Sequence, residues 1–165
     1  MPRRVSARYD GDYNASPECW ELFTEVLGKE FSNALLFGRV HQLTVDAYAA
    51  QHAGGNHRDK SVMIHLAGLH LVLERGLRPT EVPHLFQQLA KVVRAWPHLP
   101  PPTERCAVTV FDVALAESVE DHAKLAQEWA QTAWRSWAAH HQQIRDFVVA
   151  HLDFNARDAR QITAA

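Results

Sequence analysis

The chain lacks the features that identify several large classes of protein. No stretch approaches the ~20 consecutive apolar residues of a membrane-spanning helix. Its only two cysteines, Cys19 and Cys106, are too few and too isolated for a disulfide framework or a four-thiolate zinc site. The basic N-terminal residues are not followed by the apolar segment of a secretory signal. We therefore expect a cytoplasmic protein with reduced thiols and no membrane partner.

The net charge and the absence of common catalytic motifs exclude further classes of function. The 17 basic and 19 acidic residues give a net charge of −2, and no basic stripe suited to a phosphate backbone is present. We therefore expect no nucleic-acid partner. The chain also has no glycine-rich phosphate loop and no Gly-x-Ser-x-Gly motif, so neither phosphate chemistry nor a nucleophile elbow is indicated.

What the sequence does contain is helical periodicity in a chain of 165 residues, the size of one domain. Apolar residues recur at intervals of three and four between capping residues such as Ser16, Thr80 and Ser118. The pattern predicts an all-α, single-domain bundle of about five helices with a long C-terminal helix. The expected helices cover about residues 17–30, 33–53, 60–75, 80–96 and 119–152, with an N-terminal arm at 1–15, a proline-rich connector at 97–117 that includes a loop at 107–113, and a frayed tail at 153–165.

Several strings resemble an uncharacterised, histidine-rich bacterial family of unknown function. They are Tyr-Asn-Ala-Ser-Pro-Glu-Cys-Trp at 13–20, His-Gln-Leu-Thr-Val-Asp-Ala-Tyr-Ala-Ala-Gln-His at 41–52, Ser-Val-Met-Ile-His-Leu at 61–66, Leu-Val-Leu-Glu-Arg-Gly at 71–76, and the segments 120–123 and 128–137. The likeness extends over nearly the whole chain. It implies a family but no activity.

The segment 41–74 holds five of the eleven histidines and reads as a helical hairpin. If its two helices are antiparallel and turn near position 55, residues whose numbers add to about 111 lie at the same level. Asp46 is then expected to face His65, and His41 to face His70. His41 and His52 lie on one helix face but about 16 Å apart along it, so these two cannot share a metal ion.

An imidazole beside a carboxylate can bind zinc or iron, or exchange protons near pH 7. The catalytic candidates are His41, Asp46, Tyr48 and His65, and the candidate metal ligands are His41, Asp46, His52, His65 and His122. Three interpretations stay open: a divalent-metal enzyme, an acid–base enzyme acting on a small molecule in a His-lined pocket, and a non-catalytic ligand-binding or protein-interaction module. The same side chains could also be purely structural, each hydrogen-bonded to a neighbour.

Overall fold

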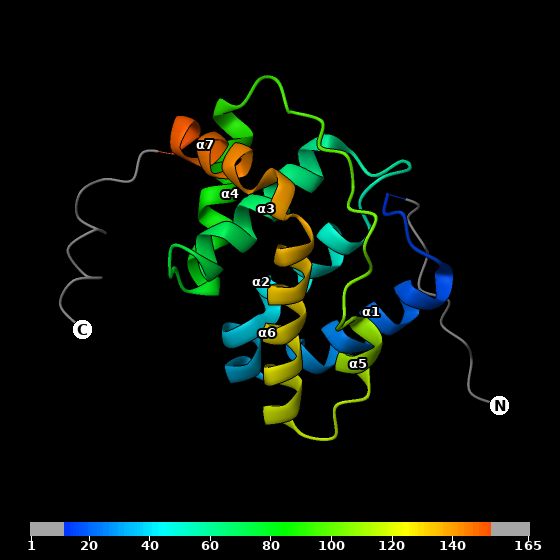
Figure 1. Ribbon diagram of the computed structural model, residues 1–165. Coiled ribbons are helices and arrows are strands. Elements are labelled where there is room, and N and C mark those ends of the chain that lie inside the picture. Colours follow the sequence, from blue (N-terminus) through cyan, green and yellow to red (C-terminus); the bar gives the residue numbers. More distant parts are fainter. Residues whose placement is uncertain (1–11, 153–165) are drawn as a thin grey trace.

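The computed structural model describes residues 12–152, which form helices and loops without a β-strand (Figure 1). The helices are α1 (Pro17–Phe31), α2 (Ala34–Gln51), α3 (Asp59–Leu73), α4 (Val82–Val92), α5 (Val110–Ala114), α6 (Val119–Ser136) and α7 (His141–His151), with two 3-10 helices, η1 (Pro79–Glu81) and η2 (Ala138–His140). The predicted all-α class is confirmed. The predicted tail at 153–165 and most of the arm at 1–15 lie outside the described residues.

Side-chain caps fix three of the helix starts. Ser16 Oγ accepts a hydrogen bond from the Cys19 backbone N–H over 3.2 Å at the start of α1, where Pro17 follows the cap. Asn33 Oδ1 caps α2, and Ser118 Oγ caps α6 by accepting from the Asp121 N–H over 3.0 Å. These caps satisfy backbone donors that have no partner within a helix. The starts of α1, α2 and α6 therefore fall within a residue of the predicted positions.

Glycines end the two helices of the hairpin. Gly76 follows α3 with a φ of 73°, and Gly54 and Gly55 follow α2 with φ values of 93° and 55°. These left-handed conformations are strained for residues with a side chain. The turn at Gly54–Gly55 reverses the chain, so that α3 packs against α2.

The last predicted helix, 119–152, is helical but not continuous. It divides at Trp137, beyond which η2 and α7 take a new direction (Figure 1). Two side-chain hydrogen bonds hold the chain at this break. Trp137 Nε1 donates to the Ala50 carbonyl of α2 over 3.2 Å, and His141 Nε2 donates to the Trp134 carbonyl of α6 over 2.9 Å. The His141 ring also stacks on Trp134, with 3.8 Å between the ring centroids. No glycine or proline marks this break in the sequence.

The connector contains one helix that the sequence did not predict. Residues 107–113 were expected to be a loop, but α5 begins at Val110 after a Thr109 cap. Asp112 accepts the Thr109 N–H over 2.8 Å, which completes a capping box. Five residues are too few for helical periodicity to be recognised. The predicted helix at 80–96 is also shorter, since α4 covers only Val82–Val92. The predicted cap at Thr80 is wrong, because Thr80 lies within η1 and α4 has no side-chain cap.

The helix α2 lies at the centre of the bundle and contacts α1, α3 and α6 (Figure 1). Three of its residues, Val40, Ala47 and Tyr48, are fully inaccessible and belong to one continuous apolar core. Within residues 12–152, none of the helices has the length and apolar character needed to cross a membrane. The polar side chains of Thr44 and Asp46, at the centre of α2, are also fully removed from water.

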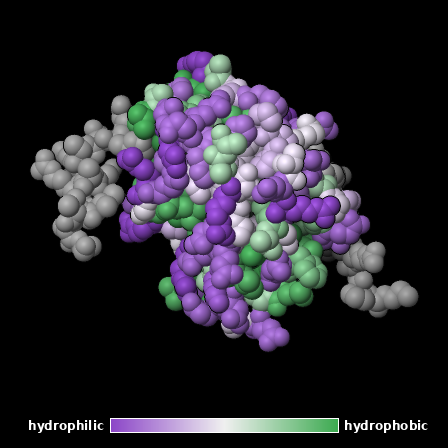
Figure 2. Space-filling model, in the orientation of Figure 1, coloured by the Kyte–Doolittle hydropathy of each residue, from purple (hydrophilic) through white to green (hydrophobic). Residues whose placement is uncertain are grey.

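The surface of the bundle is mostly polar, but some apolar residues remain exposed. Figure 2 shows hydrophobic residues gathered at the lower right of the view, over the position of α5. On and just after that helix, Phe111 and Leu115 keep 55% and 63% of their surface exposed.

Candidate functional site

The centre of the site is a hydrogen bond between α2 and α3. His65 Nδ1 lies 2.7 Å from Asp46 Oδ1, and the Asp46 side chain is fully buried. Gln42, one turn earlier on α2, donates to the same oxygen over 2.8 Å. The predicted pairing of Asp46 with His65 is therefore confirmed. Ionised Asp46 can only accept, so His65 Nδ1 carries the proton and Nε2 is the ring nitrogen left for a ligand.

The Asp46 carboxylate lies against the backbone of α3 at Gly68. A Cβ atom at position 68 would overlap Asp46 Oδ2 and the Phe86 ring, so only glycine fits there. Asp46 Oδ2 is buried and has no hydrogen-bond partner within residues 12–152. Burial raises the pKa of Asp46, and the hydrogen bonds from His65 and Gln42 oppose that rise. This carboxylate is therefore a stronger base than an exposed aspartate.

His65 lines an open cleft of about 410 Å³ beside the N-terminus of α3. The lining residues are Asp12, Tyr13, His57, Arg58, Lys60, Ser61, Ile64 and His65. The His65 side chain keeps 14% of its surface exposed, whereas the Asp46 side chain has none exposed. A buried carboxylate thus holds an imidazole that solvent and small molecules can reach. Such an imidazole can exchange a proton with a bound molecule.

A second histidine of the cleft, His57, holds a serine hydroxyl. His57 Nδ1 lies 3.0 Å from the carbonyl oxygen of His52, so this nitrogen must donate. In the neutral ring Nε2 is then an acceptor, and Ser61 Oγ lies 2.8 Å from it. Burial lowers the pKa of His57, which favours the neutral ring. The Tyr13 ring packs edge-on against His57 and holds its orientation, with 4.7 Å between the ring centroids.

Two other candidate histidines bind a different carboxylate, Glu30 of α1. Glu30 is fully buried and accepts hydrogen bonds from His41 Nδ1 over 2.8 Å and from His122 Nε2 over 3.0 Å. Thr44 Oγ1 donates to it over 2.6 Å. Burial acts to raise the pKa of Glu30, but the hydrogen bonds from His122, His41 and Thr44 outweigh it and lower that pKa. This cluster joins α1, α2 and α6.

The candidate metal ligands are consequently not brought together. His41 and His122 meet at Glu30, whereas His65 is paired with Asp46. His52 is separate again: its Nδ1 donates to the Asn14 carbonyl over 3.1 Å. Across the described part of the chain, no three His, Cys, Asp or Glu side chains form a group that could hold a metal ion. The geometry gives the predicted zinc or iron site no support.

The remaining catalytic candidate, Tyr48, lies in the core. It is fully buried and stacks on Phe23, with 3.8 Å between ring centroids and 11° between ring planes. The rings of Trp20 and Trp129 contact it edge-on. Tyr48 does not line the cleft. Its position supports packing rather than contact with a substrate.

Three residues that shape these sites were not among the residues predicted from the sequence: Glu30, His57 and Ser61. The spacing of His57, Ser61 and His65, four residues apart each time, is a signal that could have revealed the last two. Positions four apart lie on one face of a helix. Glu30 had no such signal, because its partners His41 and His122 come from distant parts of the chain.

Comparison with known proteins identifies a family without adding an activity. No curated protein and no solved structure shows significant similarity to this chain. One family model, described as a family of unknown function (DUF5946), matches residues 5–138, which include α1 to α6 and both carboxylate–histidine clusters. The chain therefore belongs to the DUF5946 family.

Proposed function

We propose that the cleft beside α3 binds a small molecule and that His65 exchanges a proton with it. The observation that carries this proposal is the pair formed by buried Asp46 and partly exposed His65, 2.7 Å apart. Asp46 holds the proton on Nδ1 and stabilises the imidazolium when Nε2 takes up a second proton. The imidazole is thereby oriented with Nε2 towards a molecule in the cleft.

The other charges of the cleft favour a substrate that carries a negative group. Arg58 and Lys60 line it beside the first turn of α3, and Asp12 is the only acidic side chain among the lining residues. We prefer the acid–base interpretation over the metal interpretation. His65 is hydrogen-bonded to Asp46 and His41 to Glu30, so the two histidines lie in separate clusters and do not face a common ion. A cytoplasmic location, where small anionic metabolites are abundant, is part of this proposal.

The test is the reactivity of His65 towards diethyl pyrocarbonate, which modifies unprotonated imidazole nitrogens. We expect carbethoxylation of His65 at Nε2, at least several-fold slower modification in D46N, where no carboxylate fixes the proton on Nδ1, and none at this position in H65Q. The matched control is the exposed pair of His98 and Asp59, whose Nδ1–Oδ1 distance is also 2.7 Å. D59N should leave the reactivity of His65 unchanged.

A chemical-shift titration then tests binding itself. Small carboxylic acids and phosphate esters, added as probes, should shift the amide signals of residues 57–65 in the wild type but not in H65Q. If no probe shifts these signals, or if D46N leaves His65 as reactive as before, the proposal is wrong.

The alternative is a non-catalytic module that binds a ligand or another protein. The exposed side chains of Phe111 and Leu115 give this alternative its support. The same experiments separate the two functions, since a binding module has no need for Asp46 to control the reactivity of His65.

A further inference from the structure

Three residues of the cleft form a single row. His57, Ser61 and His65 recur every four residues through the start of α3, and all three line the cleft of about 410 Å³. His65 is committed to Asp46 through Nδ1. His57 and Ser61 are hydrogen-bonded to each other and have no part in the proton exchange proposed for His65.

We infer that Ser61 is a nucleophile with His57 as its general base, and that the cleft carries out acyl transfer from an ester with a negatively charged group. This inference deepens the proposed function and rests on it for the cleft as the place where substrate binds. The inference depends on Ser61 and His57 and the proposed function on Asp46 and His65, so each can be rejected without the other.

The first support is the direction of the hydrogen bonds. The carbonyl of His52 accepts from His57 Nδ1, which fixes the tautomer and leaves Nε2 to accept the Ser61 hydroxyl proton. A serine hydroxyl is a weak nucleophile until an adjacent base takes its proton. The base here is oriented by a third group, the His52 carbonyl, which takes the place that a carboxylate has in a catalytic triad.

The second support is the exposure of the two partners. His57 keeps only 7% of its surface exposed, so its ring is fixed and shielded, whereas Ser61 is partly exposed and lines the cleft. The base is therefore largely shielded from bulk solvent, and the hydroxyl can be reached from the cleft. A purely structural Ser–His contact has no need for this difference.

The third support is the positive potential around Ser61. Ser61 lies in the first turn of α3, a helix of 15 residues whose N-terminus has no side-chain cap. Backbone N–H groups at such an end carry partial positive charge and stabilise a nearby oxyanion. Arg58 and Lys60, on either side of the first helical residue, add full charges to the same wall of the cleft.

The reaction balances without a co-reactant other than water. Ser61 Oγ forms a bond to the acyl carbon while its proton moves to His57 Nε2. The carbon–oxygen bond of the ester breaks, and the proton on His57 goes to the leaving alcohol. Water then attacks the acyl-serine, His57 takes the proton of that water, and the proton returns to Ser61 Oγ as the carboxylic acid leaves.

The test uses the full chain and a fluorophosphonate probe, which reacts with activated serines and requires no knowledge of the substrate. Mass spectrometry should show one adduct per chain, located at Ser61 by peptide mapping and absent in S61A. The adduct should form at least about 100-fold more slowly in H57Q, because a general base contributes a factor of that order. S32A is the matched control, since exposed Ser32 donates only to the Lys29 carbonyl.

A second variant, S61C, tests the inference without requiring that H57Q folds correctly. In S61C the thiol lies beside His57, so iodoacetamide should alkylate it faster than Cys19 and Cys106 of the same molecule. Burial raises the pKa of Cys106, which makes that thiol a slow internal reference. Absence of an adduct at Ser61, equal labelling rates in H57Q and wild type, or slow alkylation of S61C would each overturn the inference.

The variant D46N separates this inference from the proposed function. Labelling of Ser61 should change by less than about twofold in D46N, because Asp46 orients His65 and not the base His57. Labelling at Ser61 together with unchanged His65 reactivity in D46N leaves the nucleophile in place and rejects the role of His65. The opposite pair of results rejects the nucleophile alone.

Discussion

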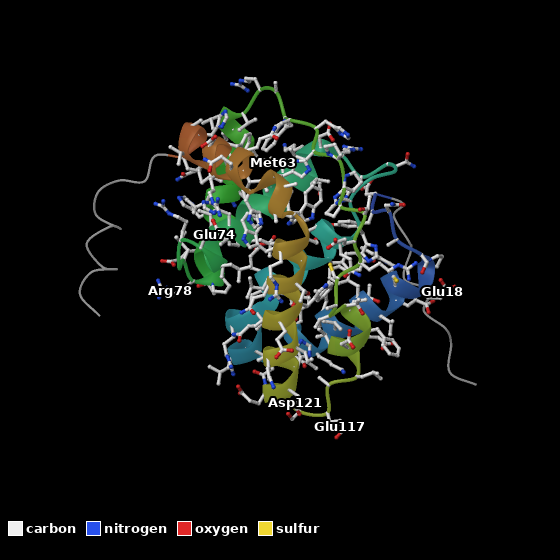
Figure 3. The ribbon with its side chains drawn as sticks, viewed as in Figure 1. Glu18, Met63, Glu74, Arg78, Glu117 and Asp121 are labelled. Atoms are coloured by element: carbon white, nitrogen blue, oxygen red, sulfur yellow. The ribbon has the colours of Figure 1, made fainter. Side chains whose placement is uncertain are left out.

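Arg145 of α7 binds Glu74, the residue after α3, through two hydrogen bonds, from Nε over 2.8 Å and from Nη2 over 2.7 Å. The same carboxylate accepts from His70 Nδ1 over 2.8 Å and from Trp134 Nε1 over 3.1 Å. Figure 3 shows Glu74 at the end of α3, on the same side of the molecule as Arg78. Glu74 therefore joins α3, which carries His65, to both α6 and α7.

Replacing Glu74 by alanine should destabilise the bundle. The donors of His70 and Trp134 would lose their acceptor while both residues stay buried, at a cost of about 1–3 kcal/mol. Urea unfolding followed by circular dichroism measures this loss. E120A is the control, because Glu120 forms an equally bidentate pair with Arg39 but on the exposed surface. Equal stability of E74A and E120A would contradict the prediction.

The contribution of Glu74 should also depend on pH. The hydrogen bonds from Arg145 lower the pKa of Glu74 from 4.5 to about 2; burial opposes this, and His70 and Trp134 reinforce it. Because the folded pKa is below the unfolded one, this stabilisation is present at pH values well above 4.5 and is lost progressively as the pH falls through 4.5 towards 2. The difference in unfolding free energy between wild type and E74Q should therefore shrink between about pH 6 and about pH 2.5. A constant difference would show that the charge of Glu74 is not responsible.

Local sequence signals were enough to predict much of this fold. The caps at Ser16, Asn33 and Ser118 and the glycines after α2 and α3 determine where helices begin and end through backbone chemistry alone. The pairing of Asp46 with His65 followed from two predicted helices, taken as antiparallel, and a predicted turn near position 55. It depended only on helix geometry, which is the same in every protein.

Contacts between distant segments were not predictable in this way. The break at Trp137 depends on the Ala50 carbonyl, which lies 87 positions earlier in the chain and accepts the indole proton. His41 was expected to face His70, but its ring binds Glu30 of α1 instead, and His70 binds Glu74. No periodicity within a single helix contains this information, so both features required the folded structure.

Gly68 should tolerate no side chain. In G68A the new methyl group would displace the Asp46 carboxylate or the Phe86 ring, and we expect a loss of about 1–3 kcal/mol of stability through overpacking. Displacement of Asp46 should also slow the modification of His65 by diethyl pyrocarbonate. Gly28 offers the matched control, because a methyl group at this position in α1 would meet no atom from another part of the chain within 4 Å. G28A should stabilise the protein by about 0.4–1 kcal/mol; a similar loss in both variants would reject the role of Gly68.

The two carboxylate–histidine clusters should respond differently to loss of their histidine. In H122A the buried carboxylate of Glu30 loses one of its three donors, so stability should fall by about 1–3 kcal/mol. The cleft beside α3 does not include His122, and the reactivity of Ser61 and His65 should stay unchanged. H65Q should behave in the opposite way: the glutamine amide can still donate to buried Asp46, so the thermal midpoint should change little, whereas probe binding in the cleft should be lost. Measuring the thermal midpoint together with the chemical-shift titration for both variants distinguishes the clusters. If H122A abolished probe binding while H65Q preserved it, the site would have to be moved from the Asp46–His65 pair to the Glu30 cluster.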